Sequence, residues 1–548
     1  MKRKVFLSAI GLFITSLSLS GCAYILEKII DEGTNSGTNV SDETFDVTKE
    51  VVNGKTVIKQ TYKDYGKYYS YSVDYCPANG DVKLLIIPVW FTDSGNYINS
   101  SKKSTVLNDI EKAYLGTNEE TGWRSVKTYY EELSSGAVTL TGTVSDWFNS
   151  AYSAAEAGAN DTVTDFIVKA ATDWYFTNNP TDNRSNYDSD NDGFIDAVMI
   201  IYGAPDYSAL DNDNWSNLWA YAYWLQEDND KSYPIPNAYF WASYDFMYSS
   251  GSFLSPTPAG SKYGSGDTSH CEIDAHTYIH EMGHIFGLED YYDYSKQQYC
   301  PAGGFSMQDY NVGSHDPFSV MAIGWANPYV VTDNAEVTIG TFQKTREFIL
   351  VTEKFNDYSS PFDEYLLLEL YSPTGLNEFD CKYDYSGHGI GPNRVGVRLW
   401  HVDARLTYAN SAKTIMQNGQ QYNVPDYKET NITTNVKESK ATYGISHAFS
   451  NTYNDPDYGS VLGEKYYNYN ILQLIRKDVS VSYNYLKDFV DKSDLFTSGS
   501  YELTSYKKQF VLGNSNKLNN GTSLKWSFRI DIQGSGNDAT AKIEIVKN

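Results

Sequence analysis

Apolar residues follow two patterns along the first half of the chain. Two continuous apolar runs, residues 82–91 and 197–202, are typical of buried strands. Residues 125–133 have helical spacing and are followed by Ser-Ser-Gly, which ends a helix, and residues 138–144 then alternate as in a strand. Residues 273–288 again favour a helix. The first half is therefore predicted to combine helices with a mixed sheet.

The pattern changes along the rest of the chain. Residues 206–266 are rich in Asn, Ser, Tyr, Trp and Gly, which predicts long surface loops. After about residue 330, short apolar runs separated by turn residues predict strands. The predicted class is α+β, with a helix-and-sheet domain at 61–330 and a β-rich, sandwich-like domain at 331–548. The predicted strands of the second domain are 347–352, 364–370, 395–402, 470–475, 508–512 and 525–532.

The N-terminus has the order of a secretory signal. Three basic residues precede an uncharged, mostly apolar run at 5–19, which is shorter than the roughly 20 residues of a membrane-spanning helix. Leu19-Ser-Gly-Cys22 follows and resembles the lipobox of bacterial lipoproteins. We therefore expect residues 1–22 to be a signal peptide, Cys22 to be acylated with palmitate-type chains, and the protein to be held at the extracellular face of the bacterial membrane. Residues 23–60 are polar and predict a flexible tether.

Charge and cysteine content narrow the class of protein further. The 548 residues include 43 Lys and Arg against 69 Asp and Glu, a net charge of −26. Such an acidic chain repels phosphate backbones, so we expect no nucleic-acid partner. Beyond Cys22 there are four cysteines, which permit three disulfide pairings, and free buried thiols are equally compatible with a chain of this size. The four are Cys76, Cys271, Cys300 and Cys381.

The strongest chemical motif is His280-Glu-Met-Gly-His284, inside the predicted helix 273–288. Residues four apart lie on one helix face about 6 Å apart along the axis, so both imidazoles reach one zinc ion. Glu281 is rotated by about 100° from His280, which suits a general base acting on water that the metal activates. His276 is one turn earlier and lies too far from His284 to share the ion, so we assign it to packing or to supporting hydrogen bonds.

A catalytic zinc takes a third protein ligand. No glutamate occurs between Glu289 and Glu336, so the plan that uses a glutamate from a later helix finds none nearby. The other plan places Gly287 three residues and a ligand six residues after His284, and Asp290 occupies that position. Asp290 is the preferred ligand, and Asp293, Asp309 and Glu289 remain alternatives. Met307, or else Met321, would form the methionine turn of this plan.

Carboxylates alternate in a second motif, residues 188–196. Alternation lets a curled loop direct several oxygens inward, and Gly193 permits a sharp bend. The loop begins like an EF-hand, but Met199 occupies its twelfth position and a strand-like run follows. We therefore predict a structural calcium site rather than a calcium sensor, with a solvated turn as the alternative. The side-chain ligands would be Asp188, Asp190, Asp192 and Asp196.

The flanks of the histidine motif carry a family resemblance. They include Asp290-Tyr-Tyr-Asp293, Gly303-Gly-Phe-Ser-Met307, Asp316-Pro-Phe-Ser319 and Gly324-Trp325. Together with residues 84–91, 125–132 and 396–403, and with the acidic loop, they resemble the immune inhibitor A family of secreted bacterial zinc metallopeptidases, which is metzincin-like. The resemblance covers about residues 80 to 480. It implies that His280 and His284 bind zinc and that Glu281 is the catalytic acid/base.

These observations predict a lipid-anchored zinc endopeptidase that hydrolyses peptide bonds of proteins. Its cofactors would be zinc and calcium, and its partners would be protein or peptide substrates and the lipid bilayer. One rival is an inactive surface binding or adhesion protein built on a peptidase fold, although the intact histidine motif argues against it. The other rival is a zinc hydrolase that acts on a bond other than a peptide bond.

Overall fold

The computed structural model describes residues 49–66, 74–225, 228–248, 272–355, 359–385, 389–417, 420–430, 445–454 and 468–548. The signal sequence, Cys22, most of the tether and Cys271 lie outside these residues. The chain forms two compact units. One contains Tyr71–Glu131 and Val138–Phe286, and the other contains Asn35–Ser70, Glu132–Ala137 and Gly287–Asn548. Among the described residues, no helix combines the length and the apolar character that crossing a bilayer requires.

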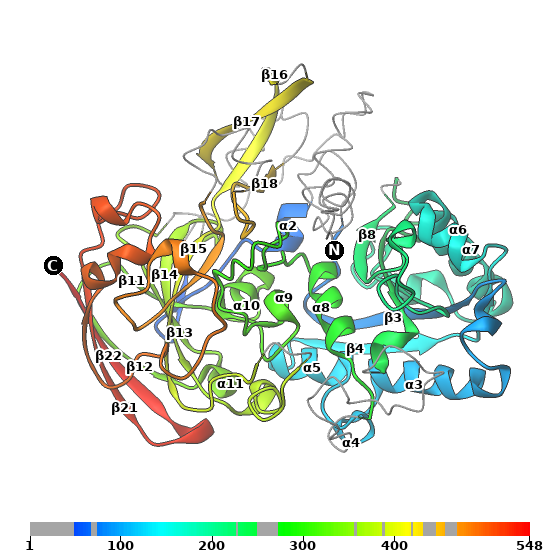
Figure 1. Cartoon of the computed structure of the whole chain (residues 1–548), viewed down its shortest axis with the longest axis horizontal. Coiled ribbons are helices and arrows are strands. Elements are labelled where there is room, and N and C mark those ends of the chain that lie inside the picture. Colours follow the sequence, from blue (N-terminus) through cyan, green and yellow to red (C-terminus); the bar gives the residue numbers. More distant parts are fainter. Residues whose placement is uncertain are drawn as a thin grey trace, which may run out of the picture. The chain divides into compact units, whose positions relative to one another are not determined.

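The first unit is built on a six-stranded sheet in the order β4-β3-β7-β10-β8, with β5 also pairing with β3 (Figure 1). All neighbours are parallel except β8, which pairs antiparallel with β10 at the edge of the sheet. The sheet is therefore mixed, as predicted. Its strands are β3 (Gly80–Trp90), β4 (Val138–Val144), β5 (Phe148–Asn149), β7 (Val198–Tyr202), β8 (Tyr221–Trp224) and β10 (Ala238–Ser243).

Strand β3 contains a proline although it is central in the sheet. The carbonyl of Val89 accepts the Gly203 N–H on the β7 side, and the carbonyl of Ile86 accepts the Ser145 N–H on the β4 side. Backbone groups alternate between the two sides, so Pro88 faces the side of β4 and β5. The pairing of β4 ends opposite Ile86 and that of β5 begins opposite Val89. Pro88 therefore lies in a gap of the ladder, where its missing N–H costs no hydrogen bond.

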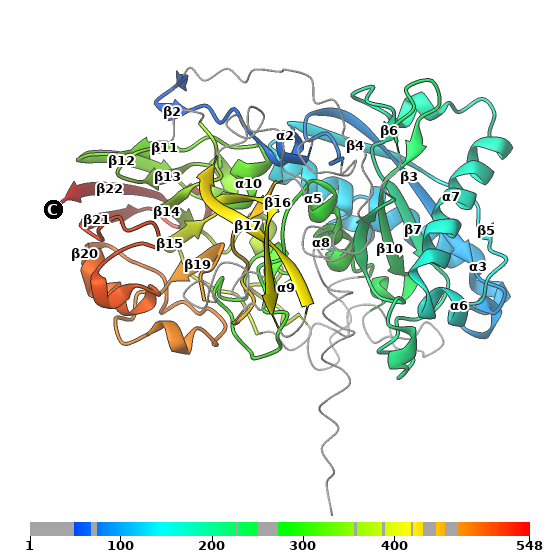
Figure 2. The ribbon, with the colours of Figure 1, turned by 90° about the horizontal axis from the view of Figure 1, so that it is seen from above.

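Helices cover both faces of this sheet. On one face, Leu85, Ile87 and Val89 share a buried cluster with α6 (Ala154–Ala159) and α7 (Asp161–Asn178). On the other face, Tyr278 of α8 (His276–Ile285) stacks on Tyr114 of α3 (Lys103–Leu115) and meets Phe240 of β10 edge-on. Figure 2 shows α8 and α7 on opposite sides of β10 and β7. The sheet thus provides a rigid support for α8.

The second unit contains a β-sandwich. A five-stranded sheet in the order β11-β13-β14-β15-β19 shares one buried core with a four-stranded sheet in the order β12-β22-β21-β20. Alternate residues of the strands supply this core, for example Leu366, Leu368 and Leu370 from one sheet and Phe528 and Ile530 from the other. The strands are β11 (Tyr329–Val331), β12 (Ala335–Gly340), β13 (Phe348–Val351), β14 (Glu364–Tyr371), β15 (Gly396–Asp403), β19 (Leu472–Ile475), β20 (Gly499–Glu502), β21 (Trp526–Gln533) and β22 (Thr540–Lys547).

Shorter elements complete the two units. The N-terminal segment 49–66 belongs to the second unit, where the Thr56 N–H donates to the Pro328 carbonyl. A hairpin of β16 and β17 with β18 forms a separate three-stranded sheet. The remaining helices and strands are β1 (Val51–Val52), β2 (Lys55–Thr56), α2 (Tyr62–Gly66), α4 (Asn118–Thr121), α5 (Val126–Leu133), β6 (Phe194–Ile195), β9 (Ile235–Pro236), α9 (Met307–Tyr310), α10 (Pro317–Ile323), α11 (Phe342–Thr345), β16 (Leu406–Gln417), β17 (Gln420–Thr430) and β18 (Ile445–His447).

The structure confirms the α+β class and corrects two local predictions. Residues 206–266 are not all loop, because β8, β9 and β10 lie within them. Aromatic residues of β10 are buried, and their polar atoms find partners elsewhere in the chain, as where Trp241 Nε1 donates to the Asn217 carbonyl at 3.1 Å. Residues 508–512 are not a strand. A 3-10 helix at Leu503–Gln509 buries Leu503, Tyr506 and Gln509 at every third position, the period of such a helix.

Candidate active site

The helix that carries the histidine motif has an aspartate just before its first residue and a glycine just after its last turn. It spans His276–Ile285, shorter than the predicted 273–288. At its start, Asp274 Oδ1 accepts the His276 N–H at 3.0 Å and so satisfies one of the unpaired donors of the first turn. After its end, Gly287 has a φ of +103°, a conformation that favours glycine. The chain turns at Gly287, three residues after His284.

Hydrogen bonds from the surrounding core hold the helix in place. The Tyr130 hydroxyl donates to the Ile279 carbonyl at 2.6 Å, and the Tyr278 hydroxyl donates to the Ser243 carbonyl at 2.8 Å. At the C-terminal end the Cys76 N–H donates to the Ile285 carbonyl at 2.9 Å. All ten residues of α8 are buried, so the helix is fixed by tertiary contacts along its whole length.

The two motif histidines face one another. Their Nε2 atoms are 3.2 Å apart, and the side chains belong to residues that are only 4% and 8% exposed. Two imidazole nitrogens that share a tetrahedral zinc at bonds of about 2.0–2.1 Å are about 3.3–3.4 Å apart. The separation of His280 and His284 therefore fits a pair of ligands for one zinc ion.

Asp290 completes a three-residue set in the same stretch of chain. One ligand atom from each of His280, His284 and Asp290 lies within 4.8 Å of the others. The Tyr294 hydroxyl donates to Asp290 Oδ2 at 2.5 Å and so fixes the carboxylate. Two imidazoles and one carboxylate match the three protein ligands of a catalytic zinc. The donor set of the structure thus fits the metal that the motif implies.

Two of the alternative third ligands have structural roles in their own loops. Asp293 Oδ1 accepts N–H groups from Ser295 and Tyr453, both at 2.9 Å. Asp309 Oδ2 accepts the Gly304 N–H at 2.7 Å, and burial raises the pKa of Asp309 to about 8. Asp309 is thus engaged with the backbone of its own loop. Both observations favour Asp290. Glu289 is buried, as are Met307 in α9 and Met321 in α10.

His276 has the supporting place that its spacing predicts. Its ring lies flat on Trp123, with centroids 3.8 Å apart and an interplanar angle of 9°. Its Nδ1 is 2.8 Å from Asp274 Oδ1, and the residue is fully buried. Neither Trp123 nor Tyr294 could be predicted from the sequence, because neither belongs to the motif. Asp274, two residues before His276, has the position of a helix-capping acid and could have been found.

Glu281 lies among buried tyrosines. Tyr114 and Tyr130 are fully buried, and burial is the main reason that their phenol pKa values are raised well above 10. The charge of Glu281 raises both pKa values further. Both phenols are therefore neutral at any physiological pH.

The acidic loop is curled as predicted. Oxygens of Asp188, Asp190 and Asp196 lie within 4.8 Å of one another. Asp188 accepts the N–H groups of Asp192 and Gly193 at 2.9 and 3.1 Å, and burial raises the pKa of Asp188. The Asp192 Oδ1 atom accepts the Phe194 N–H at 2.9 Å instead of joining the group of three. Backbone N–H groups thus hold the loop together, and calcium binding stays a prediction.

The described cysteines form no disulfide. Cys76, Cys300 and Cys381 are all buried free thiols. Burial raises the pKa of Cys381 to about 12 and that of Cys300 well above 9, so both thiols stay protonated at neutral pH. They are therefore inert core residues rather than nucleophiles.

A comparison with known families covers part of the first unit. Residues 96–232 match the family model described as "Immune inhibitor A peptidase M6, catalytic domain". The matched segment runs from before α3 through the acidic loop to beyond β8, and it ends before α8. No curated protein matches the chain. Over these residues the match confirms the resemblance to the immune inhibitor A-like metallopeptidases, whose substrates are peptide bonds of proteins or peptides.

Proposed function

We propose that this protein is a zinc endopeptidase that hydrolyses peptide bonds of proteins, with Glu281 as its general base. The observation that carries the proposal is the 3.2 Å separation of the His280 and His284 Nε2 atoms, with an Asp290 oxygen in the same group. These three residues would hold the zinc. When bound, zinc supplies a Lewis acid that polarises the scissile carbonyl and makes water more acidic.

The residues of the chain supply the proton transfers. Glu281 directly follows His280 on a fully buried helix, so its carboxylate stays close to the reacting groups. It takes a proton from the attacking water and returns that proton to the leaving amine. Because Tyr114 and Tyr130 are neutral, they do not compete with Glu281 for the proton.

We also propose that the protein acts at the extracellular face of the bacterial membrane. The support is the order of the first 22 residues, in which a basic start and an apolar run lead to Leu19-Ser-Gly-Cys22. Acyl chains on Cys22 would anchor the protein in the membrane. The polar stretch that follows would let the folded part extend away from the membrane surface. Protein substrates would then be those that are present outside the cell.

The decisive experiment compares Glu281→Gln with Glu272→Gln, an exposed glutamate just before the same helix. Casein cleavage by the Glu281 variant should fall by about 10²–10⁴-fold, because the general base is lost. Both variants should bind one zinc per chain by elemental analysis, and the Glu272 variant should keep full activity. Full activity of the Glu281 variant would reject the mechanism. A wild-type protein that binds zinc but cleaves no protein would favour the inactive binding protein.

A further inference from the structure

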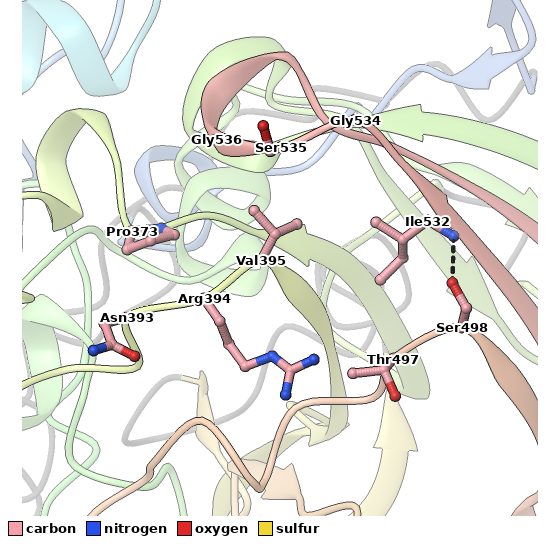
Figure 3. Close-up of a pocket in the computed structure, with 10 residues that line it drawn as sticks. All are labelled: Pro373, Asn393, Arg394, Val395, Thr497, Ser498, Ile532, Gly534, Ser535 and Gly536. Carbon is pink, nitrogen blue, oxygen red and sulfur yellow. Dashed lines mark hydrogen bonds between the residues drawn. The ribbon is translucent and has the colours of Figure 1, made fainter.

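The β-sandwich of the second unit has a cavity at one end, with a volume of about 410 Å³ (Figure 3). This volume lies within the range of ligand pockets, about 300–1,000 Å³. Four segments form its wall: the loop after β14, the loop that enters β15, the segment before β20, and the end of β21 with the turn to β22. The lining residues are Pro373, Asn393, Arg394, Val395, Thr497, Ser498, Ile532, Gly534, Ser535 and Gly536.

The charge of this pocket is opposite to that of the chain. Arg394 is exposed, and its side chain extends toward Thr497 in Figure 3. Lys477 Nζ donates to Thr497 Oγ1 at 3.1 Å. Neither cation has a carboxylate within 4.0 Å in the part of the chain that the structure describes, and no lining residue is acidic. Two unneutralised cations in a chain of net charge −26 indicate a site for an anionic ligand.

The pocket also contains hydrogen-bond donors beside its positive charge. Ser498 Oγ accepts the Ile532 N–H at 2.9 Å, so its own proton remains available to a ligand. Asn393 and Ser535 add an amide and a second hydroxyl to the lining. An arginine fork beside hydroxyl and amide donors matches the planar geometry of a carboxylate, which accepts two parallel hydrogen bonds.

We propose that this pocket, the Arg394 pocket, binds a carboxylate of a peptide, either an acidic side chain or a C-terminus. Pro373, Val395 and Ile532 provide aliphatic contacts, and the lining has no aromatic ring on which a sugar could stack. Ser498 leads into β20, the edge strand of its sheet, which can pair with an extended peptide. That the peptide belongs to a protein substrate rests on the proposed function, but the binding itself does not.

The test measures binding of small probes to the full-length protein carrying Glu281→Gln, so that no probe is cleaved. The probes are acetyl-Ala-Glu-Ala-amide, its glutamine counterpart and glucuronic acid, followed by ligand-observed NMR. We expect the glutamate peptide to bind about tenfold or more tightly than the glutamine peptide. Arg394→Gln should remove this preference. The control Arg529→Gln changes an arginine on β21 that is outside the pocket, and it should keep the preference.

Each other outcome overturns the proposal. Unchanged binding in Arg394→Gln would show that the pocket is not the site. Tighter binding of glucuronic acid than of the glutamate peptide would assign the pocket to an acidic glycan instead. Casein cleavage by the wild-type protein is measured separately. If casein is not cleaved but the glutamate peptide binds, only the peptidase proposal fails. If casein is cleaved but the peptide does not bind, only the pocket proposal fails.

Discussion

The interaction of His276 with Asp274 and Trp123 yields a quantitative prediction about the helix that carries the site. His276→Phe keeps an aromatic ring on Trp123 but removes the 2.8 Å contact from Nδ1 to the Asp274 carboxylate. A hydrogen bond to a charged group contributes about 1.5–3 kcal/mol. For a unit of roughly 200 residues this loss lowers Tm by about 3–12 °C. His276→Asn makes the opposite change, because its amide can replace Nδ1 while the ring stack is lost.

Calorimetry of both variants, with zinc analysis of the same samples, checks this reasoning. Both should unfold at lower temperature than the wild type, and both should retain one zinc per chain, because His276 is engaged with Asp274 and Trp123. His284→Ala serves as the comparison that does lose the metal. A His276 variant that folds normally but binds no zinc would refute the supporting role and make His276 a ligand.

Three further predictions concern the metal, the pH response and the anchor. Asp290→Asn should weaken zinc binding in competition with a chelator, whereas Asp293→Asn should not. His447 is fully buried, and burial lowers its pKa to about 4, so the unfolded state with a pKa of about 6.5 takes up the proton first. The contribution of neutral His447 to the free energy of unfolding is complete above about pH 6.5. It falls by about 2 kcal/mol between pH 7 and pH 5. Urea unfolding should show that this fall is smaller in His447→Gln. Palmitate labelling in cells should label the wild type and not Cys22→Ser.

The sequence predicted those strands whose burial depends on apolar side chains alone. Residues 82–91 were expected to form a strand and β3 occupies Gly80–Trp90, because a continuous apolar run suits the middle of a parallel sheet. Strand β10 was missed although all of its residues are buried. Its tyrosine and tryptophan side chains carry polar atoms that bond to distant residues, such as Tyr239 to Asp165. Such partners cannot be read from composition, so the segment resembled a loop.

The site was predictable to the extent that its residues are close in the sequence. The spacing of His280 and His284 on one helix face is a property of helix geometry, and the position of Asp290 follows from the turn at Gly287. The Arg394 pocket could not be anticipated in this way. Its residues come from segments as far apart as Pro373 and Gly536, and only the packing of the sandwich brings them together.

The geometry of the histidine pair depends on the core more than on the motif. An isolated helix of ten residues is marginal in water, so α8 has to be stabilised by its surroundings. The supports are spread along it, with Asp274 before its first turn, Tyr130 and Tyr278 in its middle, and the N–H of Cys76 at its end. The motif fixes which residues share a face, whereas these contacts fix where that face points. Zinc affinity should therefore depend on supports that no motif contains.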